Sequence, residues 1–256
     1  MDARKFIDTV TLAARLKDTV RHCYTEKGRR ESVAEHSWLT TLMAFFLQDE
    51  FPQADMNKVI TMCMIHDLGE AFTGDIPTFE KTEEDKRREK ALLFAWVDSL
   101  PPLYAQKLRA LYEEMGQRKT IEAKIYKAID GLEAVIQHNN SALSTWLPLE
   151  YTLNQTYAQD KTAFSEYLSQ VRRLAKLDTA AEKLKDKTDE VQRLSVGIAD
   201  AEDKGGREKI ESLEKEIADL DKKKMETENN ISENKKAAEA LRATESDVRG
   251  KKSGIN

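Results

Sequence analysis

The sequence is short of cysteines, of long apolar runs and of net positive charge, and each shortage excludes a class of protein. Only Cys23 and Cys63 are present among 256 residues, and they form neither a zinc-binding pattern nor a disulfide framework. No uninterrupted apolar segment is long enough to span a bilayer. The net charge of −5 argues against a surface that binds nucleic acid. We therefore expect a soluble, cytoplasmic protein that binds neither membrane nor nucleic acid.

Aromatic residues are absent from the last third of the chain, since every Trp, Tyr, Phe, His and Pro lies before residue 177. A segment without aromatics cannot readily build a globular core. Its aliphatic residues recur at coiled-coil spacing, at Leu177, Leu184, Val191 and Ile198 and then at Ile210, Leu213, Ile217 and Leu220. We predict a charged, coiled-coil-like helical tail over 177–256, broken into a hairpin at Gly205-Gly206. The alternative is a single charged helix without a packing partner.

Residues 1–176 are predicted to form an all-α domain. Ser32 and Glu35 form a capping box, which places a helix start directly before His36. No segment shows convincing strand alternation. Apolar periodicity predicts helices over 4–20, 33–49, 57–72, 82–99, 103–115, 119–138 and 158–176.

Four polar residues within these helices are candidate metal ligands: His36, the adjacent pair His66-Asp67, and Asp130. Buried charges are normally paired, protonated or bound to metal. Two imidazoles and two carboxylates suit one divalent ion such as Mn²⁺, Co²⁺, Fe²⁺ or Zn²⁺, and suit Ca²⁺ poorly. Each residue also has a structural interpretation: a hydrogen-bonded histidine at position 36, or a pairing of Asp130 with Lys or Arg. The joint pattern favours the metal site.

This pattern, with the motifs Glu31-Ser32-Val33-Ala34-Glu35-His36-Ser37, Ile65-His66-Asp67-Leu68-Gly69-Glu70 and Thr73-Gly74-Asp75-Ile76-Pro77, resembles the HD-domain superfamily of metal-dependent phosphohydrolases. The resemblance is to its small 5′-deoxynucleotidases, covers about residues 3–172 and leaves the tail outside. It implies that His36, His66, Asp67 and Asp130 bind one divalent metal, and that Glu70 and Asp75 are catalytic. It also implies a homodimer. The family has an Arg-Trp pair that contacts substrate; Arg21 matches the arginine, whereas His22 stands at the tryptophan's position.

The chemistry of these side chains agrees with that assignment. Glu70 follows His66 by four residues, so on one continuous helix it would project into the same site and could deprotonate an attacking water. Asp75 could orient that water or protonate the leaving alkoxide. Arg21 suits a phosphate group. Lys81 is a weaker phosphate candidate, with a solvated helix face as its alternative. His138 is interpreted as structural.

Three functions follow from these residues. The first is a phosphomonoesterase that hydrolyses (deoxy)nucleoside 5′-monophosphates with metal-activated water. The second keeps the same site but acts on a nucleotide diester, a triphosphate or another small phosphate ester. The third is a non-catalytic HD scaffold whose coiled-coil tail binds a partner protein.

Overall fold

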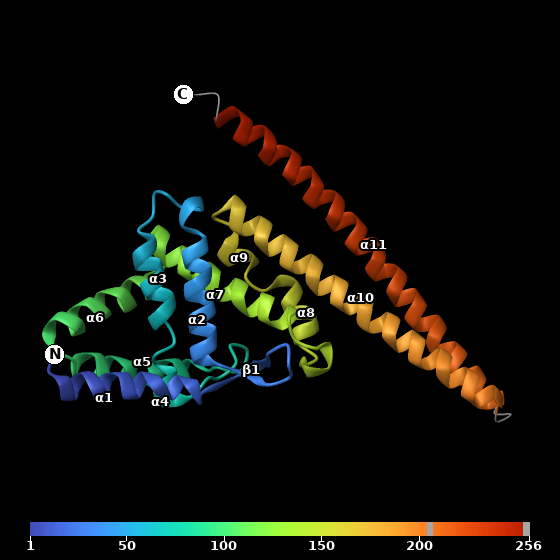
Figure 1. Ribbon diagram of the computed structural model, residues 1–256, viewed down its shortest axis with the longest axis horizontal. Coiled ribbons are helices and arrows are strands. Elements are labelled where there is room, and N and C mark those ends of the chain that lie inside the picture. Colours follow the sequence, from blue (N-terminus) through green and yellow to red (C-terminus); the bar gives the residue numbers. More distant parts are fainter. Residues whose placement is uncertain (204–206, 253–256) are drawn as a thin grey trace. The chain divides into compact units, whose positions relative to one another are not determined.

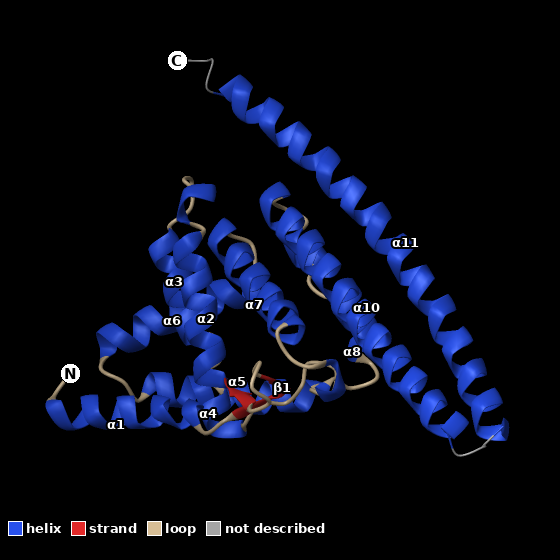
Figure 2. Ribbon diagram, turned by 45° about the vertical axis from the view of Figure 1, so that its right-hand side comes forward, coloured by secondary structure: helices blue, strands red, loops and turns tan. Residues whose placement is uncertain are grey.

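The computed structural model describes the backbone of residues 1–203 and 207–252, and the side chains of 1–198, 209–233, 235 and 236. The chain divides into two compact units, Met1–Leu168 and Ser169–Asn256, and each is described by itself. The first unit is predominantly helical, as predicted, with one small hairpin (Figures 1 and 2). Its helices are α1 (Ala3–Ala13), α2 (Val33–Phe46), α3 (Met56–Ile65), α4 (Glu70–Thr73), α5 (Glu83–Asp98), α6 (Pro102–Gln117), α7 (Ile121–Asn139), α8 (Glu150–Thr156) and α9 (Gln159–Thr162), with 3-10 turns at Ala14–Lys17, Gln48–Glu50 and Leu143–Thr145.

Helices α2, α3 and α7 pack against one another and form the core of the first unit (Figure 1). Val33 of α2, Val59 of α3, and Ile125 and Ile129 of α7 are completely buried. Burial of each such side chain stabilises the fold by about 1.5–3 kcal/mol. Helices α2 and α7 and the turn after α3 carry the candidate ligands.

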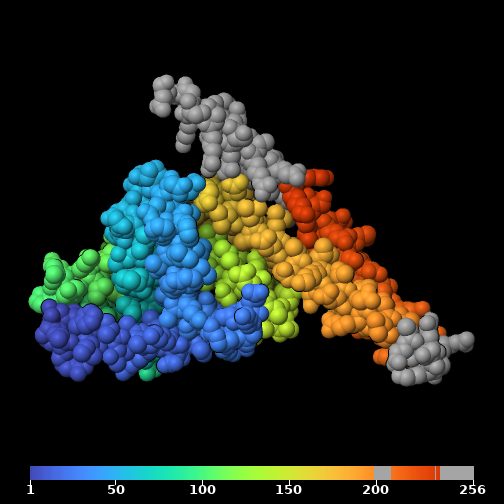
Figure 3. All heavy atoms as spheres, in the orientation of Figure 1, coloured from blue at the N-terminus to red at the C-terminus, as the bar shows by residue number. Residues whose placement is uncertain are grey.

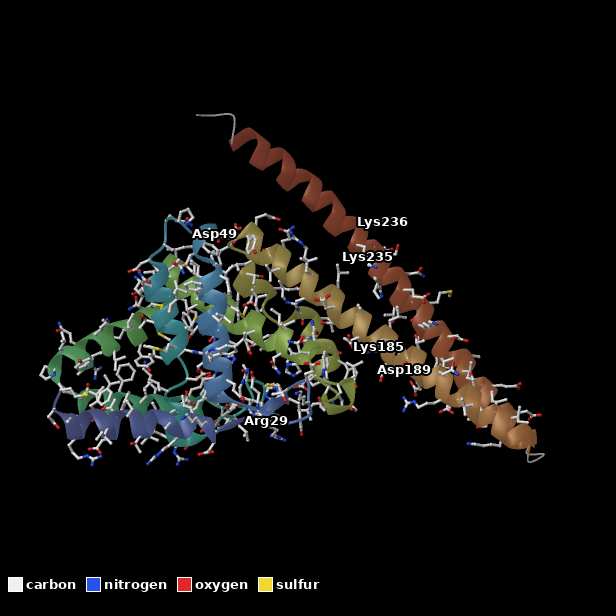
Figure 4. The ribbon with its side chains drawn as sticks, viewed as in Figure 1. Arg29, Asp49, Lys185, Asp189, Lys235 and Lys236 are labelled. Atoms are coloured by element: carbon white, nitrogen blue, oxygen red, sulfur yellow. The ribbon has the colours of Figure 1, made fainter. Side chains whose placement is uncertain are left out.

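The start of α2 is the predicted capping box. Ser32 accepts a hydrogen bond from the backbone N–H of Glu35, and a carboxylate oxygen of Glu35 accepts one from the backbone N–H of Ser32 at 2.9 Å. Arg29, labelled in Figure 4, donates to the other oxygen of Glu35 at 2.6 Å. Because the cap determines where the helix begins, it also determines the face on which His36 lies, and that side chain is 1% exposed.

The all-α prediction is confirmed, although the first unit contains one short hairpin that the sequence did not indicate. Strand β1 (Val20–Tyr24) pairs antiparallel with β2 (Arg30–Ser32), shown in red in Figure 2. The turn between them contains Gly28 at φ 77°, a conformation that favours glycine. Side chains alternate along β1, with Arg21 and Cys23 buried. A strand with only two buried positions is too short to recognise from the sequence. The hairpin nevertheless places Arg21 and His22 at the pocket.

The helix predicted over 57–72 is interrupted between Ile65 and Glu70. Side chains take carbonyl oxygens there: Cys63 O accepts a bond from Nδ1 of His66 at 2.7 Å, and Ile65 O accepts one from the hydroxyl of Tyr112 at 2.7 Å. The backbone continues instead through tight bonds from Leu68 to Ile65 and from Glu70 to Asp67. In this turn the consecutive residues His66 and Asp67 are both half-buried.

Two other predicted helices also differ from the structure. The first helix ends at Ala13 and continues as a 3-10 turn, and the helix predicted over 158–176 is divided between α9 and α10. Helix α8 was not predicted. Among the described residues, no helix is both long and apolar enough to cross a bilayer.

Helix α2 also contributes to the outer surface of the first unit, in light blue in Figure 3. Trp38, Phe45 and Phe46 of this helix are 64%, 56% and 70% exposed. Large exposed aromatics on one helix are a candidate contact surface.

The second unit consists of α10 (Glu166–Asp203), which begins in the first unit, and α11 (Arg207–Lys252). Within 209–233, the predicted seam positions Ile210, Leu213, Ile217 and Leu220 are not fully exposed, and Leu213 and Leu220 are buried. A Cβ at Gly197 of α10 would lie 3.5 Å from Leu213, and residues of both helices, including Lys185, Asp189 and Lys235 (Figure 4), line one groove. The predicted break at Gly205-Gly206 lies outside the described residues. Coiled-coil pairing stays a prediction.

Candidate functional site

The four predicted metal ligands lie together in the first unit. His36 is near the start of α2, His66 and Asp67 are in the turn after α3, and Asp130 is in α7. Nε2 of His36 lies 3.1 Å from Nε2 of His66, 3.6 Å from Oδ2 of Asp67 and 3.3 Å from Oδ1 of Asp130. Nε2 of His66 lies 3.1 Å from Oδ2 of Asp67 and 3.7 Å from Oδ1 of Asp130. Two nitrogens and two carboxylate oxygens therefore converge on one point.

Both imidazoles of this cluster are oriented by acceptors on their other nitrogen. Nδ1 of His66 donates to the carbonyl oxygen of Cys63, and Nδ1 of His36 donates to Oε2 of Glu133 at 2.5 Å. With Nδ1 carrying the proton, Nε2 of each neutral ring presents a lone pair to the other. Two lone pairs at 3.1 Å repel, and either a proton or a metal ion between them removes that repulsion. Such bonds to the outer nitrogen are typical of histidines that bind metals.

Asp130 divides its two oxygens between a lysine and the cluster. Oδ2 accepts a bond from Nζ of Lys127 at 2.6 Å, whereas Oδ1 faces the two imidazoles. The alternative of a pairing with lysine is therefore true of one oxygen only. Although burial favours the neutral acid, the charge of Lys127 holds the pKa of Asp130 well below its usual value. The side chain therefore stays ionised toward His36 and His66.

A buried network of Arg21, Glu31 and Glu133 contacts the Nδ1 side of His36. Nη1 of Arg21 lies 2.6 Å from Oε2 of Glu31 and 3.1 Å from Oε2 of Glu133, the same oxygen that accepts from His36. Glu133 is completely buried. Sequence reasoning missed Glu133 and the role of Glu31, although Glu133 follows Asp130 by one helical turn in an otherwise apolar run. That spacing is the signal that could have found it.

Glu70 and Asp75, the predicted catalytic acids, line a pocket of about 390 Å³ beside Asp67. Glu70 opens α4 and is 6% exposed. Asp75 follows Gly74, whose φ of 78° turns the chain back toward the site. Burial, and then the negative charges of Asp67 and Asp75, raise the pKa of Glu70 to about 10. Burial also raises the pKa of Asp75. The pocket is thus short of positive charge.

The three predicted substrate contacts, Arg21, His22 and Lys81, also line this pocket. Nζ of Lys81 lies 2.6 Å from Oε2 of Glu89 and 3.9 Å from Oε1 of Glu70. Its side chain is 16% exposed, so it does not belong to a solvated helix face. Each of the three contacts therefore has a carboxylate partner.

A second group of side chains in the pocket was not predicted from the sequence. Nε2 of His22 lies 2.8 Å from Oε1 of Glu150, and Nε2 of His138 lies 2.9 Å from the same oxygen. His138, interpreted from the sequence as structural, is buried but lines the pocket. Glu150 begins the unpredicted helix α8. The sequence offered no signal for Glu150, because neither His138, 12 residues away, nor His22 lies at helical spacing from it.

The residues around His36 and His66 fit a divalent cation. One oxygen of Asp67 and one of Asp130 each lie within 4 Å of both Nε2 atoms, and the Nδ1 atom of each ring is hydrogen-bonded. Oε2 of Glu70 and Oδ2 of Asp75 are buried and have no hydrogen-bond partner among the described residues. Unpartnered buried carboxylate oxygens are costly unless a cation is near. The donor set suits Mn²⁺, Fe²⁺, Co²⁺ and Zn²⁺ alike.

Comparisons with known proteins point to one family. The HD domain model matches residues 13–172. The 5′-deoxynucleotidase HDDC2 of Homo sapiens is 28% identical over 139 residues, which cover 53% of this chain and 67% of the human protein. A 5′-deoxynucleotidase of Erwinia tasmaniensis is 29% identical over 174 residues, 60% of this chain and 86% of that protein. The crystal structure of a predicted metal-dependent phosphohydrolase from Magnetospirillum magnetotacticum matches with a TM-score of 0.61 and 26% identity, and covers 71% of this chain and 96% of that one.

Proposed function

We propose that this chain, which belongs to the HD-domain family and is a metal-dependent phosphohydrolase, hydrolyses (deoxy)nucleoside 5′-monophosphates to nucleoside and phosphate. The observation that carries the proposal is the convergence of His36, His66, Asp67 and Asp130 beside two acids in one pocket. The names of the human and Erwinia relatives support the nucleotide substrate.

His36, His66, Asp67 and Asp130 would hold one divalent ion in this proposal. The ion, when bound, lowers the pKa of water, polarises the phosphoryl group and favours the ionised form of nearby carboxylates. Glu133 and the carbonyl of Cys63 hold the two rings so that their Nε2 atoms face the cluster. Lys127 holds Asp130 in the same way.

Glu70 and Asp75 would move the protons of the reaction. Water oxygen forms a bond to phosphorus while the bond from phosphorus to the 5′-oxygen breaks, and Glu70 accepts the proton that the water loses. Asp75 donates a proton to the departing 5′-oxygen, which gives the nucleoside. Proton exchange with solvent then restores both acids.

Direct attack by water suits this pocket better than a covalent intermediate. Cys63 is 1% exposed, and burial raises the pKa of its thiol to about 12, so it is not a thiolate at neutral pH. Ser37 is buried on the core side of α2. Neither side chain has the adjacent base that a nucleophile needs.

Arg21, Lys81 and His22 would contact the substrate. Glu31 and Glu133 hold Nη1 of Arg21, which orients the guanidinium in the pocket wall. Arg21 and Lys81 supply positive charge for the phosphate. His22 would contact the sugar or the base of the substrate. The preference of the enzyme for ribonucleotides or deoxyribonucleotides would therefore depend on His22.

Phosphate release from a substrate panel tests this proposal. The full chain, stripped of metal and reloaded with Mn²⁺ or Co²⁺, is incubated with deoxyribo- and ribonucleoside 5′-monophosphates, a nucleotide diester and a nucleoside triphosphate. We expect inorganic phosphate from the monophosphates. Hydrolysis of only the diester or the triphosphate would support the alternative substrates, and no release from any monophosphate with either metal would refute the proposal.

The arrangement of the whole chain is also a proposal. We propose an HD domain over 1–176, a helical tail over 177–256 that can bind a coiled-coil partner, and a cytoplasmic homodimer. The exposed aromatics Trp38, Phe45 and Phe46 on α2 are a candidate dimer contact. Light scattering of the full chain and of residues 1–176, each with and without Phe46→Ser, would separate a dimer made by the domain from one made by the tail.

A further inference from the structure

We propose that His22, His138 and Glu150 form a second metal site, which takes a divalent transition-metal ion such as Zn²⁺. The ligand atoms of these three residues lie within 4.8 Å of one another. They come from β1, the last turn of α7 and the first residue of α8. None of them belongs to the cluster around His36 and His66, and the inference does not depend on which phosphate ester is the substrate.

The orientation of His138 repeats that of His66. Nδ1 of His138 donates to the carbonyl oxygen of Ala134 at 2.8 Å, as Nδ1 of His66 donates to Cys63 at 2.7 Å. A carbonyl oxygen only accepts, so the proton of the neutral ring is on Nδ1 and a lone pair is on Nε2. That lone pair faces Oε1 of Glu150 at 2.9 Å. In the neutral ring these two acceptors repel each other, and a metal ion between them removes that repulsion.

Glu150 is held in the right place to be a ligand. Its Oε2 accepts the backbone N–H of Leu147 at 2.6 Å, which leaves Oε1 as the oxygen that both histidines face. Glu150 is only 4% exposed, so its carboxyl group is shielded from solvent. Oε1 therefore lies in a buried position between two imidazole nitrogens.

A single metal ion satisfies all three groups, whereas protons must satisfy each contact separately. Nδ1 of His22 is buried without a hydrogen-bond partner among the described residues, so nothing else there selects which of its nitrogens carries the proton. Two histidines and one glutamate form a common zinc ligand set, with ligand distances of about 2.0–2.2 Å. Three protein ligands leave a coordination position open, and all three residues line the pocket, so water or a substrate oxygen can occupy it.

Metal counting on the full chain tests this site. The protein is stripped of metal with a chelator and dialysed against buffer with a low concentration of free Zn²⁺. Elemental analysis then gives the number of zinc ions bound per chain. The variants His22→Phe, Glu150→Gln and Asp67→Asn are measured in the same way. His22→Phe keeps an aromatic ring against Phe79, which His22 contacts edge-on, and so is the variant least disruptive to folding. We expect two ions per wild-type chain, one in each variant, and none in His22→Phe combined with Asp67→Asn.

The outcomes distinguish this site from the site of the proposed function. One ion in the wild type that Asp67→Asn removes and His22→Phe leaves in place would overturn the second site and leave the first intact. Two ions in both His22→Phe and Glu150→Gln would overturn it as well. Anomalous scattering at the zinc edge from wild-type crystals gives the positions of the ions without any variant, and a peak only between His36 and His66 would have the same meaning.

Discussion

Glu133→Gln should weaken metal binding although Glu133 does not face the metal cluster. Oε2 of Glu133 accepts hydrogen bonds from Nδ1 of His36 at 2.5 Å and from Arg21 at 3.1 Å, in a completely buried position. Glutamine keeps the shape but removes the charge, so His36 becomes a poorer donor to a metal and a less firmly oriented one. Substitution of such a supporting residue typically costs about 10–100-fold in metal affinity, or about 1.4–2.7 kcal/mol.

The same substitution also lowers stability. A hydrogen bond to a charged group contributes about 1.5–3 kcal/mol and a neutral one about 1 kcal/mol. Glutamine makes the bond from His36 a neutral one, which costs about 0.5–2 kcal/mol in the free energy of unfolding, and loss of the buried ion pair with Arg21 adds to this cost. Urea denaturation of the metal-free protein measures this loss, and calorimetric titration with Mn²⁺ measures the affinity.

Glu31→Gln is the matched control for Glu133→Gln. Glu31 is also buried and contacts the same nitrogen of Arg21 at 2.6 Å, but it has no hydrogen bond to His36. We expect it to lose stability while it keeps metal affinity near that of the wild type. Equal losses of affinity in the two variants would show that the network acts through folding alone, and wild-type affinity in Glu133→Gln would refute the supporting role.

Three further substitutions have defined outcomes. Asp67→Asn should lower metal affinity by more than about 100-fold and abolish phosphate release, with an unchanged circular dichroism spectrum, because it removes a charged ligand of the cluster. Gly74→Ala should cost about 1–3 kcal/mol in urea denaturation, because φ 78° and ψ 167° suit glycine alone, whereas Gly116→Ala, in a helix and equally free of neighbours, should not destabilise. Glu35 has its pKa lowered from 4.5 to about 2, first by the hydrogen bond from Arg29, so it contributes stability above pH 4.5 that is lost as the pH falls toward 2. The stability difference between wild type and Glu35→Gln should therefore shrink over that range, and a constant difference would contradict this assignment.

Local signals predicted the parts of the site that depend on local structure. The capping box at Ser32 and Glu35 gave the start of α2 and thereby the place of His36. Apolar periodicity gave α7 and the inward side of Asp130. In both cases the determining contacts lie within one or two helical turns, which is the distance over which sequence patterns carry information.

The features that were missed depend on contacts between residues far apart in the sequence. The break after Ile65 needs the hydroxyl of Tyr112, 47 residues away, as a competitor for a backbone carbonyl. In the sequence, Glu133 looks like an ordinary acidic residue of a helix. Its role depends on the bond from Arg21, which lies 112 residues earlier in the chain. The hairpin at Arg21 has too few residues for its alternation to be recognised. Side chains that compete for backbone acceptors, or that pair across the core, leave no periodic signal.

His138 was the one histidine that sequence reasoning left out of the site. The chain has four histidines, and three of them, His22, His36 and His138, line one pocket, while His66 contacts His36 at 3.1 Å. Each faces a carboxylate through Nε2, and in three of them Nδ1 is bonded to a carboxylate or a carbonyl. A buried imbalance of lone pairs is stable only where cations are supplied. In a chain with so few histidines, a histidine in an apolar helix such as His138 is therefore better treated as a ligand candidate until its Nε2 partner is known.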